Sequence, residues 1–387
     1  MENYDIHFRW MRAGILYSEV KANSKTREIE VVNFTDEREE NVFGSRENPT
    51  WDDLVHFVES RCIPPTRHNI RDLLDMMGLP KYDAFALFQI TSGHFAKDKC
   101  YAEIEKWIYD YASSEALISH SSEGDQFKWT LDNKWYKLDC KGYESLAEFI
   151  CSEILSASNM TEFCNIVEYW IEWSVRDNLK QPVSVSNNFL ENTEKLVTIN
   201  DIVTNTGYTF SRDLEKAVEE LISLISEFTG LPKESVGKIL TAIFEFDAFV
   251  LNEDRHTRNI GITFDFSAKQ YKIGPIFDNG SALLSYQRRY IIDNPISVCI
   301  KAIKSKPFSV KFESILRICH LKYGRQLWID EQLMNQKVDE ALEVASQFYS
   351  SRYLDRIGNI IRVQSNRCRW IFERPDNSNF EGTSMFG

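Results

Sequence analysis

Three polar residues in the stretch 247–280 have types and spacing suited to moving a phosphoryl group. Asp254 follows an apolar helical run, Asn259 comes five residues later, and Asp278 closes a second apolar segment. Transfer of a γ-phosphoryl group needs a carboxylate that accepts the proton of the attacking hydroxyl, and oxygen ligands that hold Mg²⁺ against the phosphates. Carboxylate and amide oxygens are the hard donors that Mg²⁺ prefers. We therefore predict Asp254 as the catalytic base and Asn259 and Asp278 as metal ligands.

The pattern around these residues predicts a helix, a loop and a β-hairpin. Apolar residues recur at helical spacing over 234–250, and Asp254 lies in the polar turn that follows. The segments NIGITF and YKIGPIF alternate between apolar and other residues on either side of a polar turn, which is typical of a hairpin. Its second strand would end on Asp278 and place this carboxylate beside the loop. Asp and Asn also cap helices and turns without any catalytic role, and the kinase interpretation depends on all three residues occurring in this order.

The strings DRHTRN (254–259) and FDNG (277–280) resemble the HipA-like serine/threonine kinases. In that family the histidine follows the catalytic aspartate, and the metal-binding aspartate lies in a YD or FD motif. The string DRHxxN is also similar to the phosphatidylinositol 3-/4-kinases, which share a distant kinase ancestry. The resemblance is strongest over 120–350 and weaker over 40–110. It implies an α+β protein with a bilobal protein-kinase-like fold, in which a small β-rich N-lobe and a large α-helical C-lobe follow an N-terminal accessory α/β segment.

The domain boundaries expected from this resemblance are an accessory domain over 1–115, a kinase N-lobe over 116–202 and a kinase C-lobe over 203–387. The accessory domain begins with alternating residues that suggest a small β-structure. Helical patterns follow at 51–59 and 69–77, separated by a loop that two prolines interrupt. We expect this domain to be a structural cap or docking unit without chemistry of its own.

One lysine lies where kinases bind the nucleotide phosphates. In kinases, a strand lysine contacts the α- and β-phosphates and pairs with a glutamate on the next helix. Lys137 lies in the alternating segment 135–139, and an amphipathic helix is predicted over 143–155. The resemblance therefore implies nucleotide binding by Lys137 with Glu148 as its partner, and Glu144, one turn earlier, is the alternative. A lysine in an amphipathic strand is otherwise an ordinary solvated residue.

The phosphate-binding loop differs from that of ordinary protein kinases. No GxGxxG precedes the predicted strands, and Gly124 is the only glycine near them on that side. The loop of HipA-like enzymes is not of the GxGxxG form and can carry a phosphorylatable serine. Ser119, Ser121 and Ser122 are therefore candidate self-phosphorylation sites, and a flexible serine-rich loop is the alternative.

Other patterns predict the elements that surround the site. These are a strand over 163–173, a loop over 174–194, a short strand over 195–199 where an adenine-contacting hinge is expected, and an amphipathic helix over 213–229. Ser211 is a plausible N-cap for that helix. Arg288 and Arg289 lie in the segment 279–307, which takes the place of an activation or substrate loop, and could bind a phosphate or an acidic substrate.

The composition is typical of a soluble globular protein, and we expect it to be cytoplasmic. The 387 residues include 43% hydrophobic and 27% charged residues, and the formal net charge is −13. This charge argues against direct sequence-independent binding of nucleic acid, which depends on Lys and Arg at the phosphates. The eight cysteines contain no CxxC pair, which favours reduced thiols. We expect no membrane association, because no apolar run approaches the roughly 20 residues that span a bilayer and the first residues contain no apolar signal segment.

The function that these features predict is ATP-dependent phosphorylation of Ser or Thr in a cellular protein, with ATP and Mg²⁺. The resemblance implies a toxin, autophosphorylation, and neutralisation by a DNA-binding antitoxin; a basic partner would complement this acidic chain. One alternative is a lipid kinase acting on phosphatidylinositol, which should carry a basic membrane-facing surface. Another is a pseudokinase scaffold that binds nucleotide without turnover.

Overall fold

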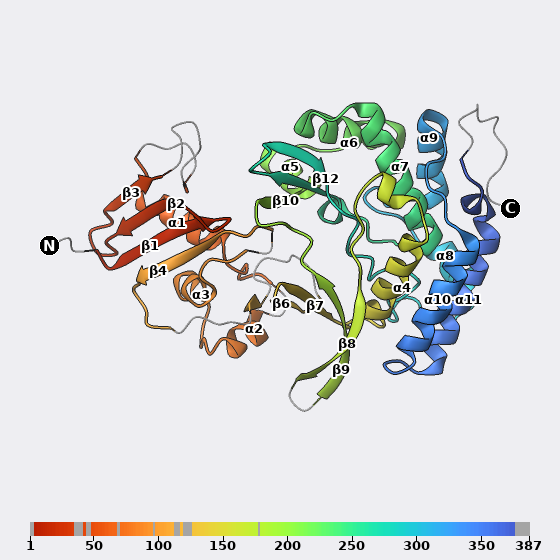
Figure 1. Ribbon diagram of the computed structural model, residues 1–387, viewed down its shortest axis with the longest axis horizontal. Coiled ribbons are helices and arrows are strands. Elements are labelled where there is room, and N and C mark those ends of the chain that lie inside the picture. Colours follow the sequence, from red (N-terminus) through yellow and green to blue (C-terminus); the bar gives the residue numbers. More distant parts are fainter. Residues whose placement is uncertain are drawn as a thin grey trace. The chain divides into compact units, whose positions relative to one another are not determined.

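The computed structural model of the chain divides into two compact units (Figure 1). The first unit comprises Met1–Trp135, Leu190–Lys195 and Asp265–Ala268, and the second comprises Tyr136–Phe189, Leu196–Phe264 and Lys269–Gly387. The structure describes residues 4–34, 42–43, 48–67, 70–95, 97–111, 117–118, 126–176 and 179–375. Gly124 and the candidate serines Ser119, Ser121 and Ser122 lie outside the described residues. The domain boundaries at 115 and 202 stay predictions.

The first unit is built on an antiparallel sheet with the strand order β3-β2-β1-β4. Its strands are β1 (Ile6–Arg12), β2 (Ile15–Ala22), β3 (Ile29–Asn33) and β4 (Tyr101–Lys106). Buried residues of β1, among them Phe8, contact aromatic residues of α1 (Trp51–Ser60) and α3 (Ala84–Thr91). The small β-structure predicted for the start of the chain is therefore present, and it forms one core with these helices.

Local capping explains where the helices of the first unit begin. Thr50 and Asp53 form a reciprocal capping box at the start of α1, which agrees with the helix predicted over 51–59. The second predicted helix is α2 (Ile70–Met76), and Gly78 follows it with a φ of +70° that suits glycine. A short pair of strands, β5 (Leu117–Ile118) and β6 (Lys128–Leu131), completes the regular structure described for this unit.

β7 (Lys134–Leu138) enters the second unit at Tyr136, and there β7, β9 (Leu179–Asn187) and β8 (Trp170–Arg176) are hydrogen-bonded in that order. The helix α4 (Glu144–Ser156) packs against β8 and β9, close to the predicted bounds of 143–155. The predicted strand over 163–173 forms only at its C-terminal end. The predicted loop over 174–194 is wrong, because β8 continues to Arg176 and β9 occupies Leu179–Asn187. The buried residues of β9 include serines as well as valines, so hydropathy alone did not mark the strand.

A second sheet pairs β10 (Glu194–Thr198), β11 (Gly261–Asp265) and β12 (Gln270–Ile273) in that order. The hairpin predicted before Asp278 is therefore present, but its second strand ends at Ile273. The chain leaves the hairpin at Gly274, whose N–H bonds to Gly261, and Pro275 has no N–H to continue the ladder. Ile276 instead makes an isolated parallel bridge with Ile166.

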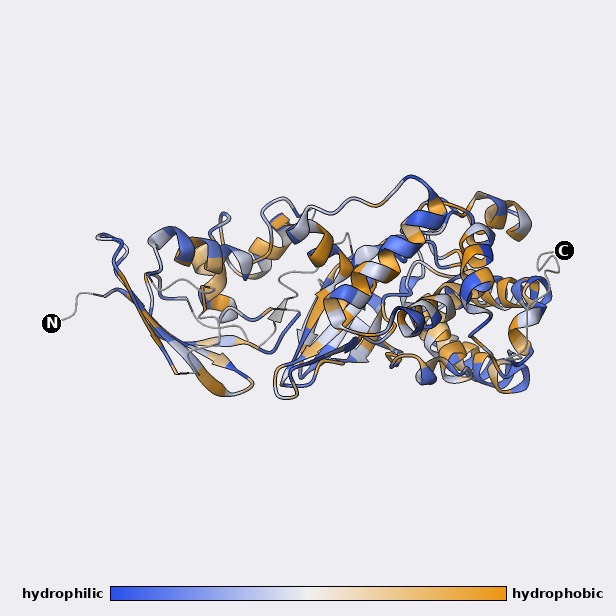
Figure 2. Ribbon diagram, turned by 90° about the horizontal axis from the view of Figure 1, so that it is seen from above, coloured by the Kyte–Doolittle hydropathy of each residue, from blue (hydrophilic) through white to orange (hydrophobic). Residues whose placement is uncertain are grey.

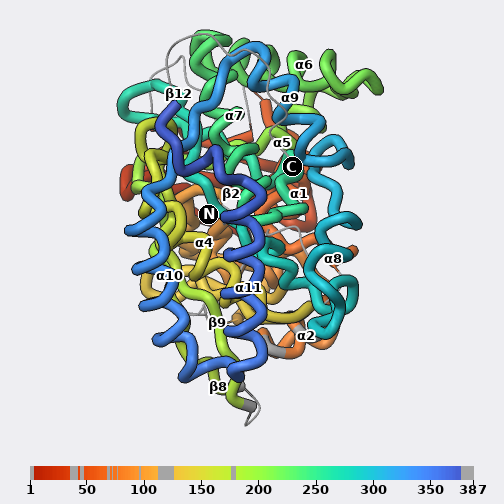
Figure 3. The backbone as a smooth tube through the Cα atoms, turned by 90° about the vertical axis from the view of Figure 1, so that its right-hand side faces the viewer, coloured from red at the N-terminus to blue at the C-terminus, as the bar shows by residue number. Residues whose placement is uncertain are grey.

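The rest of the second unit is helical and surrounds one hydrophobic core. Its helices are α5 (Ile199–Thr206), α6 (Leu214–Thr229), α7 (Lys233–Val250), α8 (Ile296–Ala302), α9 (Phe312–Tyr323), α10 (Glu331–Ala345) and α11 (Ser351–Arg367). The long helices carry hydrophobic residues on one side and hydrophilic residues on the other (Figure 2). α10 and α11 lie side by side (Figure 3). No helix among the described residues is long and apolar enough to cross a membrane.

Two of these helices show how the sequence sets the path of the chain into the site. The N-cap of α6 is Asp213, whose side chain accepts the N–H of Lys216, and not Ser211; the Ser211 hydroxyl accepts the N–H of Asp213 one step earlier. α7 is buried along most of its C-terminal half and ends at Leu251, which adopts a left-handed conformation with a φ of +59°. This reversal directs the chain into the loop that carries Asp254.

Candidate active site

Lys137 lies at the centre of a buried cluster of polar groups. It is 6% exposed and lies near the end of β7. Its Nζ donates to Glu148 Oε1 at 2.6 Å and to Asp278 Oδ1 at 2.8 Å, and the Tyr169 hydroxyl lies 3.4 Å away. Burial alone would lower the pKa of Lys137, but the carboxylates of Asp278 and Glu148 outweigh it and hold the pKa well above its ordinary value. The ammonium group therefore stays charged.

Glu148, and not Glu144, is the glutamate that pairs with this lysine. Glu148 is fully buried on α4, and its second oxygen accepts the backbone N–H of Asn279 at 2.8 Å. The carboxylate of Glu144 instead accepts the N–H groups of Lys141 and Gly142 at 2.6 and 2.8 Å, in the turn before α4. Position 144 thus fixes the start of the helix, and position 148 presents its carboxylate to the lysine one turn later.

Asp278 is held in an uncommon backbone conformation. Its φ is +60°, in the left-handed region that Asp tolerates better than most residues but that still costs about 1–3 kcal/mol. Its N–H points to the Tyr169 hydroxyl at 3.4 Å. The next glycine packs closely on α4, since a Cβ on Gly280 would lie 3.3 Å from the Glu144 Cβ. These contacts fix the direction of the Asp278 carboxylate toward Lys137.

Asp254 and Asn259 are connected through the backbone of their loop. The amide nitrogen of Asn259 donates to the backbone carbonyl of Asp254 at 2.9 Å, and Asn259 is 7% exposed. This bond leaves the Asn259 amide oxygen as its remaining ligand atom. The N–H of Asp254 is accepted by the side-chain oxygen of Asn252 at 3.2 Å. The loop therefore presents the Asp254 carboxylate and the Asn259 oxygen from a constrained backbone.

Arg255 joins this loop to the segment that carries Asp278. Its side chain is 1% exposed and forms a bidentate pair with the fully buried Asp247, with two N···O distances of 3.0 Å. The same guanidinium donates to the carbonyls of Asn259 at 3.1 Å and Phe277 at 2.7 Å, and to the Asn279 side chain at 2.5 Å. Asn259 and the residues on either side of Asp278 therefore meet at one buried cation.

Two further side chains approach the Asp254 carboxylate. Lys306 Nζ lies 2.8 Å from its Oδ1, and His256 Nε2 lies 3.8 Å from its Oδ2. Burial lowers the pKa of His256 against the opposing effect of Asp254, so the ring is neutral near pH 7. Lys306 is therefore the charged partner of Asp254.

The structure thus brings the five predicted site residues into one unit, and it adds residues that the sequence did not single out. Lys137, Glu148 and Asp278 are in direct contact. Asn259 is hydrogen-bonded to Asp254, and Arg255 links Asn259 to the residues on either side of Asp278. Tyr169 and Lys306 carried no sequence signal, because each is distant along the chain from its partner. Arg289, a candidate for binding a phosphate or an acidic substrate, donates to the carboxylate of Glu253 at 2.9 Å. The chemical roles of the predicted residues stay predictions.

The donor atoms fit a nucleotide bound with Mg²⁺. Asn259 offers an amide oxygen and Asp278 a carboxylate, which are hard ligands, and Lys137 offers an ammonium group for phosphate oxygens. Within the described residues, no group of three or more His, Cys, Asp or Glu side chains could hold a metal ion. Mg²⁺ is commonly bound through one or two carboxylates together with substrate phosphates and water, and Asn259 and Asp278 are the side chains that would hold it here.

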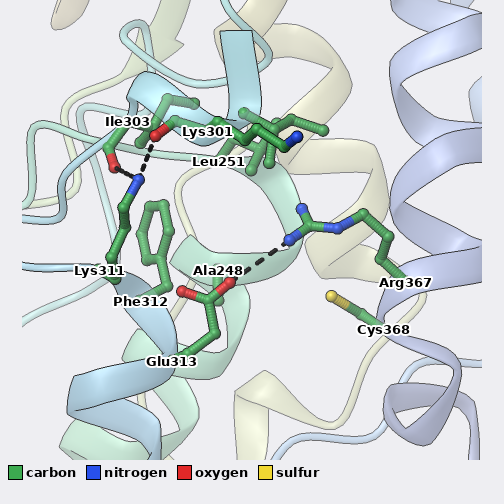
Figure 4. Close-up of a pocket in the computed structure, with 10 residues that line it drawn as sticks. Ala248, Leu251, Lys301, Ile303, Lys311, Phe312, Glu313, Arg367 and Cys368 are labelled. Atoms are coloured by element: carbon green, nitrogen blue, oxygen red, sulfur yellow. Dashed lines mark hydrogen bonds and ion pairs between the residues drawn. The ribbon is translucent and has the colours of Figure 1, made fainter. Parts of the chain in front are cut away.

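A separate pocket of about 270 Å³ lies next to the end of α7 (Figure 4). Ala248 and Leu251 line it on one side. The end of α8, the α8–α9 connection, the start of α9 and the end of α11 line the rest. An ion pair of 3.4 Å between Arg367 and Glu313 crosses its edge. None of the predicted site residues lines this pocket.

The comparisons with known proteins find matches among solved structures. No family model and no curated protein matches the chain. Shewanella oneidensis HipA, in a complex with HipB and operator DNA, aligns over 93% of this chain and 97% of its own, with a TM-score of 0.51 and 11% identity. The Helicobacter pylori proinflammatory kinase CtkA aligns over 66% of this chain and 94% of its own, with a TM-score of 0.47 and 14% identity.

A choline/ethanolamine kinase family protein from Mesorhizobium loti aligns over 67% of this chain and 88% of its own, at 12% identity, with a TM-score of only 0.21. Of the three, HipA alone exceeds a TM-score of 0.5, and at this identity it shows the fold alone. The predicted fold class is confirmed: the chain has a kinase-like α+β fold similar to that of HipA, with a β-rich N-terminal region and a helical C-terminal region.

Proposed function

We propose that this protein is an ATP-dependent protein serine/threonine kinase. The observation that carries the proposal is the buried Lys137 ammonium shared between Glu148 and Asp278. A strand lysine that pairs with a helix glutamate, next to a metal-binding aspartate, is what kinases use to hold the nucleotide phosphates. Stability alone does not call for a buried lysine between two carboxylates, because hydrophobic residues in their place would often stabilise the fold at least as well.

Each predicted residue then has a distinct role. Lys137 binds oxygens of the α- and β-phosphates, and Glu148 keeps its ammonium group in place. Asn259 and Asp278 hold Mg²⁺, which when bound neutralises charge on the phosphates. Asp254 orients the hydroxyl of the acceptor and takes its proton.

The proposed transfer accounts for every bond, electron pair and proton. A bond forms between the acceptor oxygen and the γ-phosphorus, and the bond from that phosphorus to the bridging oxygen of ATP breaks, so that ADP leaves with the electron pair. The hydroxyl proton goes to the Asp254 carboxylate. Catalysis on this site would come from positioning and charge stabilisation more than from covalent chemistry.

We further propose a Ser or Thr hydroxyl of a cellular protein, or of the chain itself, as the acceptor. The similarity to HipA, which was solved with HipB and operator DNA, supports a toxin-like role and a DNA-binding partner of the antitoxin type. The net charge of −13 favours a basic partner by charge complementarity. Growth arrest of a bacterial host on expression of the wild type, but not of an Asp254→Asn variant, is the expected outcome for a toxin.

The direct test is transfer of phosphate from γ-labelled ATP in the presence of Mg²⁺. The variants are Asp254→Asn and Asp278→Asn, and Asp293→Asn is the matched control because Asp293 pairs with Arg352 on the surface. A generic basic protein and vesicles containing phosphatidylinositol serve as separate acceptors. We expect labelled Ser or Thr with the wild type and the control alone.

The other outcomes separate the alternatives. Label found only in lipid would establish a lipid kinase. ATP binding without transfer to any acceptor would favour the pseudokinase scaffold. Absence of ATP binding would refute the kinase assignment.

A further inference from the structure

Carboxylates around the candidate site are each paired with a cation from another part of the chain. The ion pairs are Lys137 with Glu148 and Asp278, Arg255 with Asp247, Arg289 with Glu253, and Lys306 with Asp254. The first two cations are buried, and their partners are fixed. The last two come from the segment 279–307 and have side chains that are 48% and 46% exposed.

The segment 279–307 is docked on the loop by several contacts. The Glu253 carboxylate accepts hydrogen bonds from Arg289 at 2.9 Å and from the Tyr290 hydroxyl at 2.6 Å. At the far end of the segment, the backbone N–H of Lys306 donates to the Glu253 carbonyl at 3.3 Å, while its ammonium reaches Asp254. Two successive loop residues are therefore held by one segment.

The backbone that carries Lys306 is itself anchored. Ser305 is 1% exposed and exchanges backbone hydrogen bonds with Val310, at 2.6 and 3.2 Å. The position of the Lys306 Cα is thus set by a closed turn, while its side chain extends to the Asp254 carboxylate. A chance surface contact of a lysine would not have its backbone held both by the Ser305–Val310 turn and by the bond to the Glu253 carbonyl.

We infer that Lys306 is a positioning residue for Asp254, an inference that rests on the proposed kinase function. Its ammonium engages Oδ1 at 2.8 Å, a distance typical of a charge-assisted hydrogen bond, and leaves Oδ2 for the acceptor hydroxyl. The positive charge also offsets the repulsion between the Asp254 carboxylate and the phosphates of the nucleotide. The segment that docks on Glu253 therefore also orients the base.

The test compares Lys306→Gln, Lys306→Arg and Lys306→Ala with the wild type. Lys304→Gln is the matched control, because Lys304 is an exposed lysine two residues away. We expect kcat of the Gln variant to fall about tenfold to a hundredfold, the order of loss that misplacement of a catalytic group causes. The KM for ATP should change little, since Lys137 holds the phosphates. The Arg variant should retain more activity than Gln, and a small alkylamine should restore part of the activity of Lys306→Ala.

These readouts separate positioning from a merely structural role. A loss that neither Arg nor the alkylamine relieves, with a parallel rise in the KM for ATP, would overturn the inference. Unchanged activity of Lys306→Gln would overturn it as well. Increased activity would show instead that Lys306 blocks the base.

A second measurement does not depend on turnover. Acetylation of lysines by an amine-reactive ester, followed by mass spectrometry, should modify Lys306 several-fold faster in Asp254→Asn than in the wild type, with Lys304 unchanged. Equal rates would refute the contact while leaving the kinase assignment to the transfer assay. Protection of Lys306 in a protein that transfers no phosphate would refute the proposed function, and the positioning role with it.

Discussion

Replacement of Arg255 by Met should destabilise the second unit strongly, because it leaves Asp247 buried without its cation. Both side chains are almost fully buried, at 1% and 0% exposure. Removing one partner of a buried ion pair costs about 3–5 kcal/mol. The carbonyls of Asn259 and Phe277 also lose a donor, at about 1–3 kcal/mol for a group left unsatisfied, but these losses overlap with the first. We therefore expect the free energy of unfolding to fall by about 3–5 kcal/mol.

A double variant tests whether the unpaired charge is the cause. Arg255→Met combined with Asp247→Leu removes both charges, and should recover a large part of the loss, because apolar replacement of a buried pair is often near neutral. Arg352→Met is the matched control, since Arg352 pairs with Asp293 on the surface and its loss should change stability little.

Urea unfolding followed by circular dichroism measures these differences, with hydrogen exchange in α7 reporting on the second unit alone. Phosphate transfer by the folded Arg255→Met variant should also fall, because the guanidinium links the loop that carries Asp254 to the residues beside Asp278. If Arg255→Met lowered the free energy of unfolding by less than about 1 kcal/mol, where about 3–5 kcal/mol is expected, the buried ion pair would not have the proposed effect on stability. The same would follow from a double variant no more stable than the single one.

Two further predictions concern stability. Burial raises the pKa of Asp139 to about 7, so between about pH 4 and pH 7 the folded protein holds a proton that the unfolded chain releases. The free energy of unfolding should therefore fall as the pH rises from about 4 to about 7. Asp139→Asn should remove this part of the fall, which is measured as the free energy of unfolding at several pH values. A Cβ on Gly237 would lie 2.2 Å from the Tyr323 ring, so Gly237→Ala should lower the free energy of unfolding by about 1–3 kcal/mol. A Cβ on Gly358 in α11 would have its nearest atom at 4.0 Å, so Gly358→Ala should raise the free energy of unfolding by up to about 1 kcal/mol through helix propensity. Thermal unfolding of the pair checks the sign of each change, and the opposite order would contradict the packing seen between α7 and α9.

Much of the site could be predicted because its signals are local. The strand that carries Lys137 and the helix that carries Glu148 follow each other directly, and each shows its own periodicity. Asp254 and Asn259 lie in one short loop. The expected partner of the lysine could be narrowed to two glutamates, and the backbone N–H groups of the turn before α4, which occupy Glu144, decided between them.

Other features depend on contacts that the sequence pattern does not express. Lys306 reaches Asp254 across 52 positions, and Tyr169 reaches Lys137 across 32. β9 was missed because buried serines interrupt its apolar pattern. Ser211 and Asp213 are equally good N-caps by residue type, and only the position of the Lys216 N–H decides which one caps α6.

We propose that Asp278, held by Lys137, supports phosphate transfer from ATP. The most direct measurement is incorporation of γ-labelled phosphate into Ser or Thr by the wild type and by Asp278→Asn at saturating Mg²⁺, with nucleotide binding measured in parallel. We predict transfer by the wild type, and loss of transfer in a variant that remains folded. Equal incorporation by both proteins, or a wild type that neither binds ATP nor transfers phosphate, would contradict it.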